Sequence, residues 1–202
     1  MRLDAASVCD ALVEQLTAGA SVAAGMAAII AKCRLLLPSA DWDAFASLPY
    51  GGDAGRLEAW ARAEIGRLPK PPMGGLWFGL VEIGSHSSQA KNALYLAGSS
   101  GPSDRWMDNI DLRPVDNTYA PLQSLTSLPT SSQKTPGGIE SEASWALPLA
   151  FAALAVRSAL PNLAKAHGLP TVAIPVAVGF DSGDLLQLGR LGPTGFEVAF
   201  LW

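Results

Sequence analysis

A histidine among serines is the pattern in this chain that comes nearest to a catalytic site. His86 lies in the stretch Gly84–Ser88, in which three of the five residues are serine. Histidine transfers protons near neutral pH, and a neighbouring serine could act as the nucleophile of a hydrolase. One hypothesis is therefore a small hydrolase built from His86, Ser85 or Ser99 and an aspartate from residues 104–116. The competing interpretation, which we prefer, is a solvent-exposed histidine in a loop.

Other patterns that could carry chemistry are less specific. Residues 88–91 read Ser-Gln-Ala-Lys and match the S-x-x-K of serine acyl-enzymes, but that chemistry needs a helix and this copy lies in an expected loop. His167 precedes a glycine at an expected helix end, where a cation interacts favourably with the helix dipole. Two histidines without a cysteine pair give little support to a zinc site. We therefore predict no intrinsic enzymatic activity, no bound metal and no cofactor.

The most distinctive polar feature is a group of acidic, basic and aromatic side chains within an irregular region, residues 98–125. Carboxylates on a loop can bind Ca²⁺ or Mg²⁺, but this spacing matches no EF-hand and the arginines offer internal partners. Aromatic residues beside charged ones are frequent anchors of protein interfaces. The sequence thus predicts a partner-binding surface made of Asp104, Arg105, Trp106, Asp108, Asp111, Arg113, Asp116 and Tyr119.

Within that surface, each residue type has an expected role. Trp106 would supply the apolar anchor, and the aspartates would face a basic cleft on a protein partner and speed the encounter. The competing interpretation is that Trp106 is buried and the aspartates are solvated. Under that interpretation, Trp106→Ala lowers thermal stability instead of weakening a complex.

Composition limits the class of protein. Apolar residues make up 49% of the 202 residues, enough to bury a core, and charged residues only 16%. A net charge of −4 without a run of Lys or Arg argues against a nucleic-acid partner. The acidic N-terminal residues are unlike a signal peptide, and the longest uncharged run, residues 15–31, is short for a membrane span. We expect a cytoplasmic protein without a membrane segment, with Cys9 and Cys33 as buried thiols.

The apolar periodicity predicts the elements that position these residues. A 3.6-residue period predicts helices in residues 4–68, with Asp4, Ser21 and Asp53 as N-caps. A further helix should begin near Ser141, and Pro161 should end or kink it.

Strands are predicted after the Pro- and Gly-rich residues 70–75. Apolar runs in residues 76–83 and 93–97 indicate a hairpin, and residues 118–122 are a further strand candidate. Three more runs, separated by tight-turn signals, indicate an antiparallel meander over residues 171–179, 185–190 and 196–202. Pro175 predicts a free edge or a bulge in the first of these three strands.

Together these elements predict one α+β domain spanning residues 1–202, with a helical part (1–70) and a sheet-containing part (71–202). The N-terminal helices and one later helix should pack on a mostly antiparallel sheet of about five strands. A separate helical domain ending near Lys70 is the alternative. The predicted core contains Leu12, Leu16, Met26, Ile30, Trp60, Ile65, Phe78, Leu80, Leu96, Leu149, Val156, Val176 and Val178.

Two patches of strand and turn carry a resemblance to known proteins. One combines Leu76-Trp77-Phe78-Gly79-Leu80 with Leu94-Tyr95-Leu96-Ala97-Gly98-Ser99, and the other is Val178-Gly179-Phe180-Asp181-Ser182-Gly183-Asp184. Together they resemble small uncharacterised proteobacterial proteins of the immunity type, which are associated with polymorphic or type VI secreted toxins. The resemblance implies an acidic protein that neutralises a cognate toxin by blocking its active site. The patches cover about a tenth of the chain, and they contain structural residues only.

Overall fold

The computed structural model describes residues 2–69, 71, 74–84, 90–101, 106–114, 116, 118–132, 138–164, 169 and 171–201. The helices in these residues are α1 (Ala5–Thr17), α2 (Val22–Leu36), α3 (Trp42–Ala46), α4 (Ala54–Gly66), α5 (Gln123–Ser127) and α6 (Glu140–Leu163). Two short 3-10 turns are η1 (Tyr50–Gly52) and η2 (Trp106–Asn109). The strands are β1 (Gly75–Ile83), β2 (Lys91–Ser99), β3 (Ile174–Phe180), β4 (Leu185–Gly192) and β5 (Gly195–Leu201).

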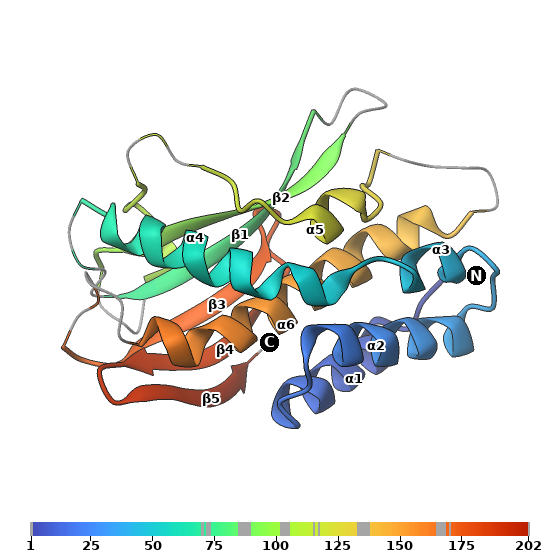
Figure 1. Cartoon of the computed structure of the whole chain (residues 1–202), viewed down its shortest axis with the longest axis horizontal. Coiled ribbons are helices and arrows are strands. Elements are labelled where there is room, and N and C mark those ends of the chain that lie inside the picture. The colour runs from blue at the N-terminus through green and yellow to red at the C-terminus, as the bar shows by residue number, and fades with distance from the viewer. Residues whose placement is uncertain are drawn as a thin grey trace.

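The strands form one five-stranded sheet with the order β2-β1-β3-β4-β5. β1 and β2 make the predicted hairpin, and β3, β4 and β5 make the predicted antiparallel meander. β3 lies parallel to β1, because the chain returns to the sheet through α5 and α6 (Figure 1). The register of β3 against β4 shifts directly after Val176, which places the predicted irregularity beside Pro175. The α+β class with a mostly antiparallel sheet is confirmed.

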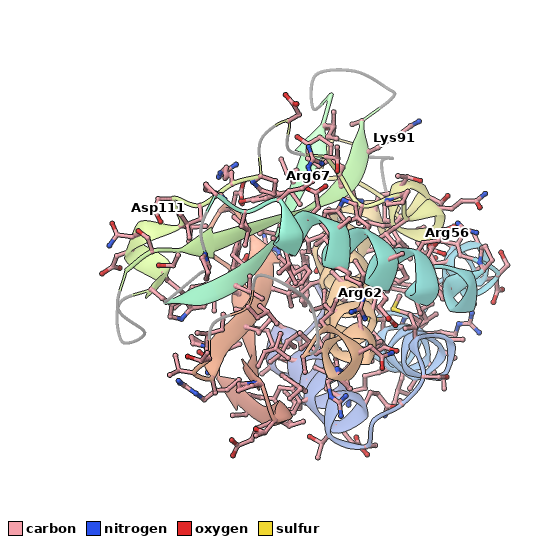
Figure 2. The ribbon with its side chains drawn as sticks, turned by 60° about the vertical axis from the view of Figure 1, so that its left-hand side comes forward. Arg56, Arg62, Arg67, Lys91 and Asp111 are labelled. Carbon is pink, nitrogen blue, oxygen red and sulfur yellow. The ribbon has the colours of Figure 1, made fainter. Side chains whose placement is uncertain are left out.

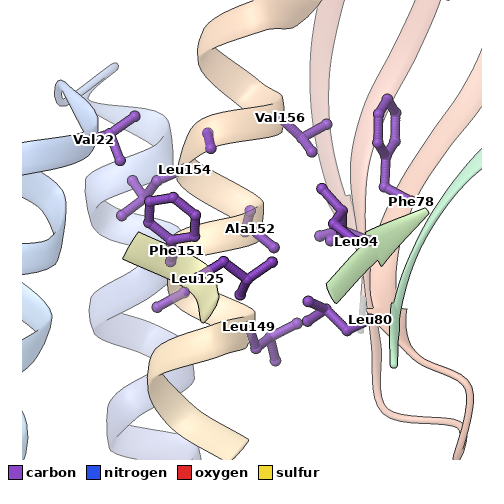
Figure 3. Close-up of a cluster of buried hydrophobic side chains, with 14 of the residues drawn as sticks. Val22, Phe78, Leu80, Leu94, Leu125, Leu149, Phe151, Ala152, Leu154 and Val156 are labelled. Atoms are coloured by element: carbon purple, nitrogen blue, oxygen red, sulfur yellow. The ribbon is translucent and has the colours of Figure 1, made fainter. Parts of the chain in front are cut away.

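Helix α6 is the centre of the core. Figure 3 shows Leu149, Ala152 and Val156 on the side of α6 that faces the sheet, and Leu154 on the side that faces α2. At Gly25 of α2, an added Cβ would lie 2.6 Å from a Leu154 methyl carbon. The absence of a side chain therefore allows α2 to approach α6 closely.

α6 is long and apolar enough to cross a membrane, but its most apolar window is 83% buried, as in the core helix of a soluble protein.

One contiguous hydrophobic cluster runs from Leu3 to Leu191 and contains residues of both the helical and the sheet-containing parts. Every residue of the predicted core is buried. Cys33 is fully buried as predicted, whereas Cys9 is only half-buried, and both thiols are free. The prediction for Cys9 was wrong because one side of α1 borders a cleft that is described below.

Three local predictions need correction. Ser21 accepts a hydrogen bond from the Ala24 amide and caps α2 as predicted, but Asp4 and Asp53 make no capping hydrogen bond to the helices that follow them. Of the two effects predicted for Pro161, an end or a kink, the end at this residue is not found, because α6 continues for two residues to Leu163. Residues 118–122 form no strand. The Ala120 amide donates a hydrogen bond to the Leu94 carbonyl at the edge of β2, and the chain then enters α5.

Candidate partner-binding surface

The irregular segment after β2 is held against the sheet at its start by Trp106. This side chain is 3% exposed and belongs to a second buried cluster with Trp77, Tyr95 and neighbouring alanines. A Cβ on Gly75 would lie 2.5 Å from the indole of Trp106, so the first residues of β1 make room for the ring by having no side chain. The prediction of Trp106 as an accessible anchor was therefore wrong, and its competing interpretation as a buried residue is correct.

Hydrogen bonds fix the next part of the segment. The Asp111 carboxylate accepts from the Ser100 amide at 2.9 Å and from the Ser100 hydroxyl at 2.6 Å. Leu112 and Gly98 exchange two backbone hydrogen bonds in an isolated bridge at the end of β2. Asp111, labelled in Figure 2, is exposed, but its carboxylate is already used to hold the loop. We therefore assign Asp111 a structural role, which is to hold the loop to Ser100.

The far end of the segment is tied to α4. The Thr118 hydroxyl donates to Glu64 at 2.8 Å and accepts from the Trp60 indole N–H at 3.2 Å. The buried Asp53 carboxylate accepts from the amides of Gln123 and Ser124, the first residues of α5. Asp53 therefore connects two helices instead of capping its own.

Among the described residues of this segment, the exposed side chains are Met107, Asp108, Asn109, Asp111, Arg113, Asp116, Thr118 and Tyr119. Met107 is 44% and Tyr119 48% exposed, and Asp108 and Asp116 are exposed as well. Asp116 adopts a positive φ of 56°, a backbone conformation that Asp tolerates better than most residues. Sequence reasoning missed Met107, because nothing in the pattern separates it from its buried neighbour Trp106. Two residues of the predicted surface, Asp104 and Arg105, lie outside the described residues.

Arg113 is the remaining residue of the predicted surface. It lies over the ring of Tyr95, which belongs to the same buried cluster as Trp106. Its guanidinium carbon is 4.9 Å from the centre of the Tyr95 ring. The Tyr95 hydroxyl donates to Asp181 at 2.5 Å and accepts from the Trp77 indole N–H at 3.1 Å. The Tyr95 ring lies across Gly79 on β1, where a Cβ would come within 2.2 Å of it. These residues border a hollow of about 320 Å³ beside Met107.

Burial and the hydrogen bond to Asp181 together raise the pKa of Tyr95 to about 12, although the hydrogen bond from Trp77 and the charge of Arg113 lower it. Because the pKa of Tyr95 is higher in the folded protein than its ordinary value of 10, the protonated hydroxyl stabilises the folded state. This contribution to stability is fully present below pH 10. That effect is lost as the pH rises from 10 to about 12.

We expect a tyrosinate absorbance step near pH 12 that disappears in Tyr95→Phe. Spectrophotometric titration of both proteins with unfolding monitored in parallel checks this expectation, and Tyr119→Phe is the matched control that keeps the step. An unchanged step in Tyr95→Phe would contradict the assignment.

The residues of the hydrolase hypothesis are only partly described. Ser85, His86, Ser88 and His167 lie outside the described residues. Ser99 is completely buried, and its hydroxyl accepts a hydrogen bond from the Gly101 amide. Ser99 is therefore a structural residue and not an accessible nucleophile, which corrects that part of the hypothesis. Among the described residues, no group of three or more His, Cys, Asp or Glu side chains could hold a metal ion.

Arg56 and Arg62 of α4, and Arg67 directly after this helix, are labelled in Figure 2 and form ion pairs within that region of the chain. Arg56 pairs with Asp53 at 3.0 Å, and Arg62 pairs with Glu58 at 3.1 Å. Arg67 pairs with Glu64 at 2.8 Å. Each of these three guanidinium groups therefore has a carboxylate partner.

Comparisons with protein-family models, with curated proteins and with solved structures give no match to this chain. The resemblance to immunity-type proteins therefore stays a hypothesis that rests on the two sequence patches.

Proposed function

We propose that this protein has a non-enzymatic, protein-binding function, and that it binds a basic partner through the exposed part of the segment Met107–Tyr119. The observation that supports this proposal is the combination of two exposed large apolar side chains with two exposed carboxylates, Asp108 and Asp116. Exposed apolar and aromatic side chains beside charge are typical of interfaces.

The way in which the segment is held also supports the proposal. Trp106 and Asp111 fix its start, and Thr118 fixes its end on Glu64. A loop that is held in place on both sides loses little conformational entropy on binding, and such loops often carry recognition. The specific role that we propose is that of an immunity protein, which neutralises a secreted toxin in the cytoplasm by covering a basic active site.

The test is a double charge reversal, Asp108→Lys with Asp116→Lys. Each reversal puts a positive charge where the proposed basic partner approaches, so we expect the complex to weaken by at least about tenfold, chiefly through slower association at low salt. The chain is used as bait in extracts of its source cells. Proteins that it retains are identified by mass spectrometry, and the retained partner is then measured by surface plasmon resonance.

A double reversal with the same net charge, Glu14→Lys with Glu197→Lys, is the control. Glu14 and Glu197 are exposed on α1 and on β5, which is the strand at the opposite edge of the sheet from β2. The proposal requires this control to bind like the natural protein. Equal weakening by both double variants would show a general charge effect and would contradict the proposed surface.

A further inference from the structure

A large cleft lies between the first turns of α1, the first half of α6 and the turn that joins β3 to β4. Its volume is about 790 Å³, which is within the range of small-molecule sites. Most of its described lining is apolar and comes from Cys9, Met107, Trp145, Leu149, Phe180 and Leu185. A cleft with this lining offers a ligand contact with two aromatic rings and several aliphatic side chains.

The charged side chain in the described lining of this cleft is acidic. Asp184 lies in its lining, and no Lys or Arg occurs among the described residues that line it. Burial raises the pKa of the Cys9 thiol, and the nearby charges of Asp10 and Asp184 raise it further. The Asp184 carboxylate therefore lies beside the apolar lining, and Trp145 and Phe180 bring two aromatic rings to the same cleft, which a cation can contact.

We propose that this cleft binds a small organic cation with an apolar body, such as an amphiphilic amine or a quaternary ammonium compound. The apolar body fills the space beside Leu149 and Phe180, and the cationic group lies near Asp184 at the rim. An anionic amphiphile of the same size would meet repulsion from Asp10 and Asp184. This ligand site goes beyond the proposed protein-binding function, and it involves carboxylates different from those of the proposed interface.

Binding of octyltrimethylammonium, used below its micelle concentration, tests the charge preference. Isothermal titration calorimetry should show one site per chain, with affinity at least about tenfold higher than for octyl sulfate, which has the same chain and the opposite charge. In the variant Asp10→Asn with Asp184→Asn, we expect this ratio to fall below about threefold, because both carboxylates are then neutral. Equal affinity of the two amphiphiles for the natural protein would overturn the proposal, as would the absence of saturable binding.

The position of the site is tested with the thiols. Cys9 lines the cleft, whereas Cys33 is 0% exposed, so iodoacetamide should modify Cys9 first in the folded protein. Bound octyltrimethylammonium should slow alkylation of Cys9 by at least about fivefold at saturation, in line with occupancy of the site. Alkylation of Cys9 at an unchanged rate under saturating ligand would overturn the assignment of the ligand to this cleft.

A blocking variant provides an independent measurement. Ala5 is exposed and lines the cleft, so Ala5→Trp should fill part of the entrance and abolish binding. Ala6→Trp adds the same side chain at the next exposed position, which does not line the cleft, and should bind the ammonium compound normally. Normal binding by Ala5→Trp would overturn the proposal. None of these variants alters Asp108 or Asp116, so failure of the ligand site leaves the partner-binding proposal to be decided by its own charge reversals.

Discussion

Replacing Trp106 with alanine should lower the free energy of unfolding by about 3–5 kcal/mol. The indole is 3% exposed and lies over Gly75, and it packs with Trp77 and Tyr95 on the face of the sheet opposite α6. Truncation leaves a cavity on that face that the surrounding strands cannot fill without moving. Urea denaturation monitored by circular dichroism measures the loss.

The neighbouring residue provides a matched control for this prediction. Met107 is 44% exposed, so Met107→Ala should change the free energy of unfolding by no more than about 0.5 kcal/mol. Under the proposed function, Met107→Ala weakens the complex instead. If Trp106→Ala were as stable as the natural protein, the indole would not be packed as described. Trp106 would then again be a candidate interface residue.

Phe151→Ala should also cost about 3–5 kcal/mol, because Phe151 is fully buried in α6 and its ring centre lies 5.7 Å from that of Tyr50. α6 packs on both the sheet and the N-terminal helices, so the loss should be shared by both parts of the chain. Thermal unfolding followed by far-ultraviolet circular dichroism and by tryptophan fluorescence should give one coincident transition at a lower temperature. Leu35→Ala, at a position that is 76% exposed, is the control that should leave this transition near its natural temperature.

The same experiment separates the two domain organisations that the sequence allows. If residues 1–70 formed a domain of their own, the two signals would report separate transitions, and Phe151→Ala would shift only one of them. A single shifted transition supports one domain built around α6.

Much of the fold could be predicted from sequence because it depends on local patterns. The apolar period of 3.6 located α1 to α4 and α6, and the apolar runs and turn signals located the strands, including the meander after Ile174. The short helix α5 was not predicted, because it lies in a region of the sequence without a regular apolar pattern. The core followed from the same periodicity, since a residue on the apolar stripe of an element has to be covered. The parallel pairing of β1 with β3 was not predictable in this way, because about a hundred residues separate the two strands.

The candidate surface was less predictable for the same reason. Whether Trp106 is exposed depends on Gly74 and Gly75, which are distant in sequence and leave room for the ring. The hydrogen bond from Tyr95 to Asp181 joins residues 86 positions apart, and no local pattern indicates it. The acidic character of the segment was visible from composition alone, but its use of Asp111 to hold Ser100 was not.

The most direct test of the proposed function is amide hydrogen exchange of this chain with and without the purified partner. The proposal predicts slower exchange on binding in peptides that cover Met107–Tyr119, with little change in peptides from α4 or β5. Protection confined to other parts of the chain, with unchanged exchange in Met107–Tyr119, would contradict it.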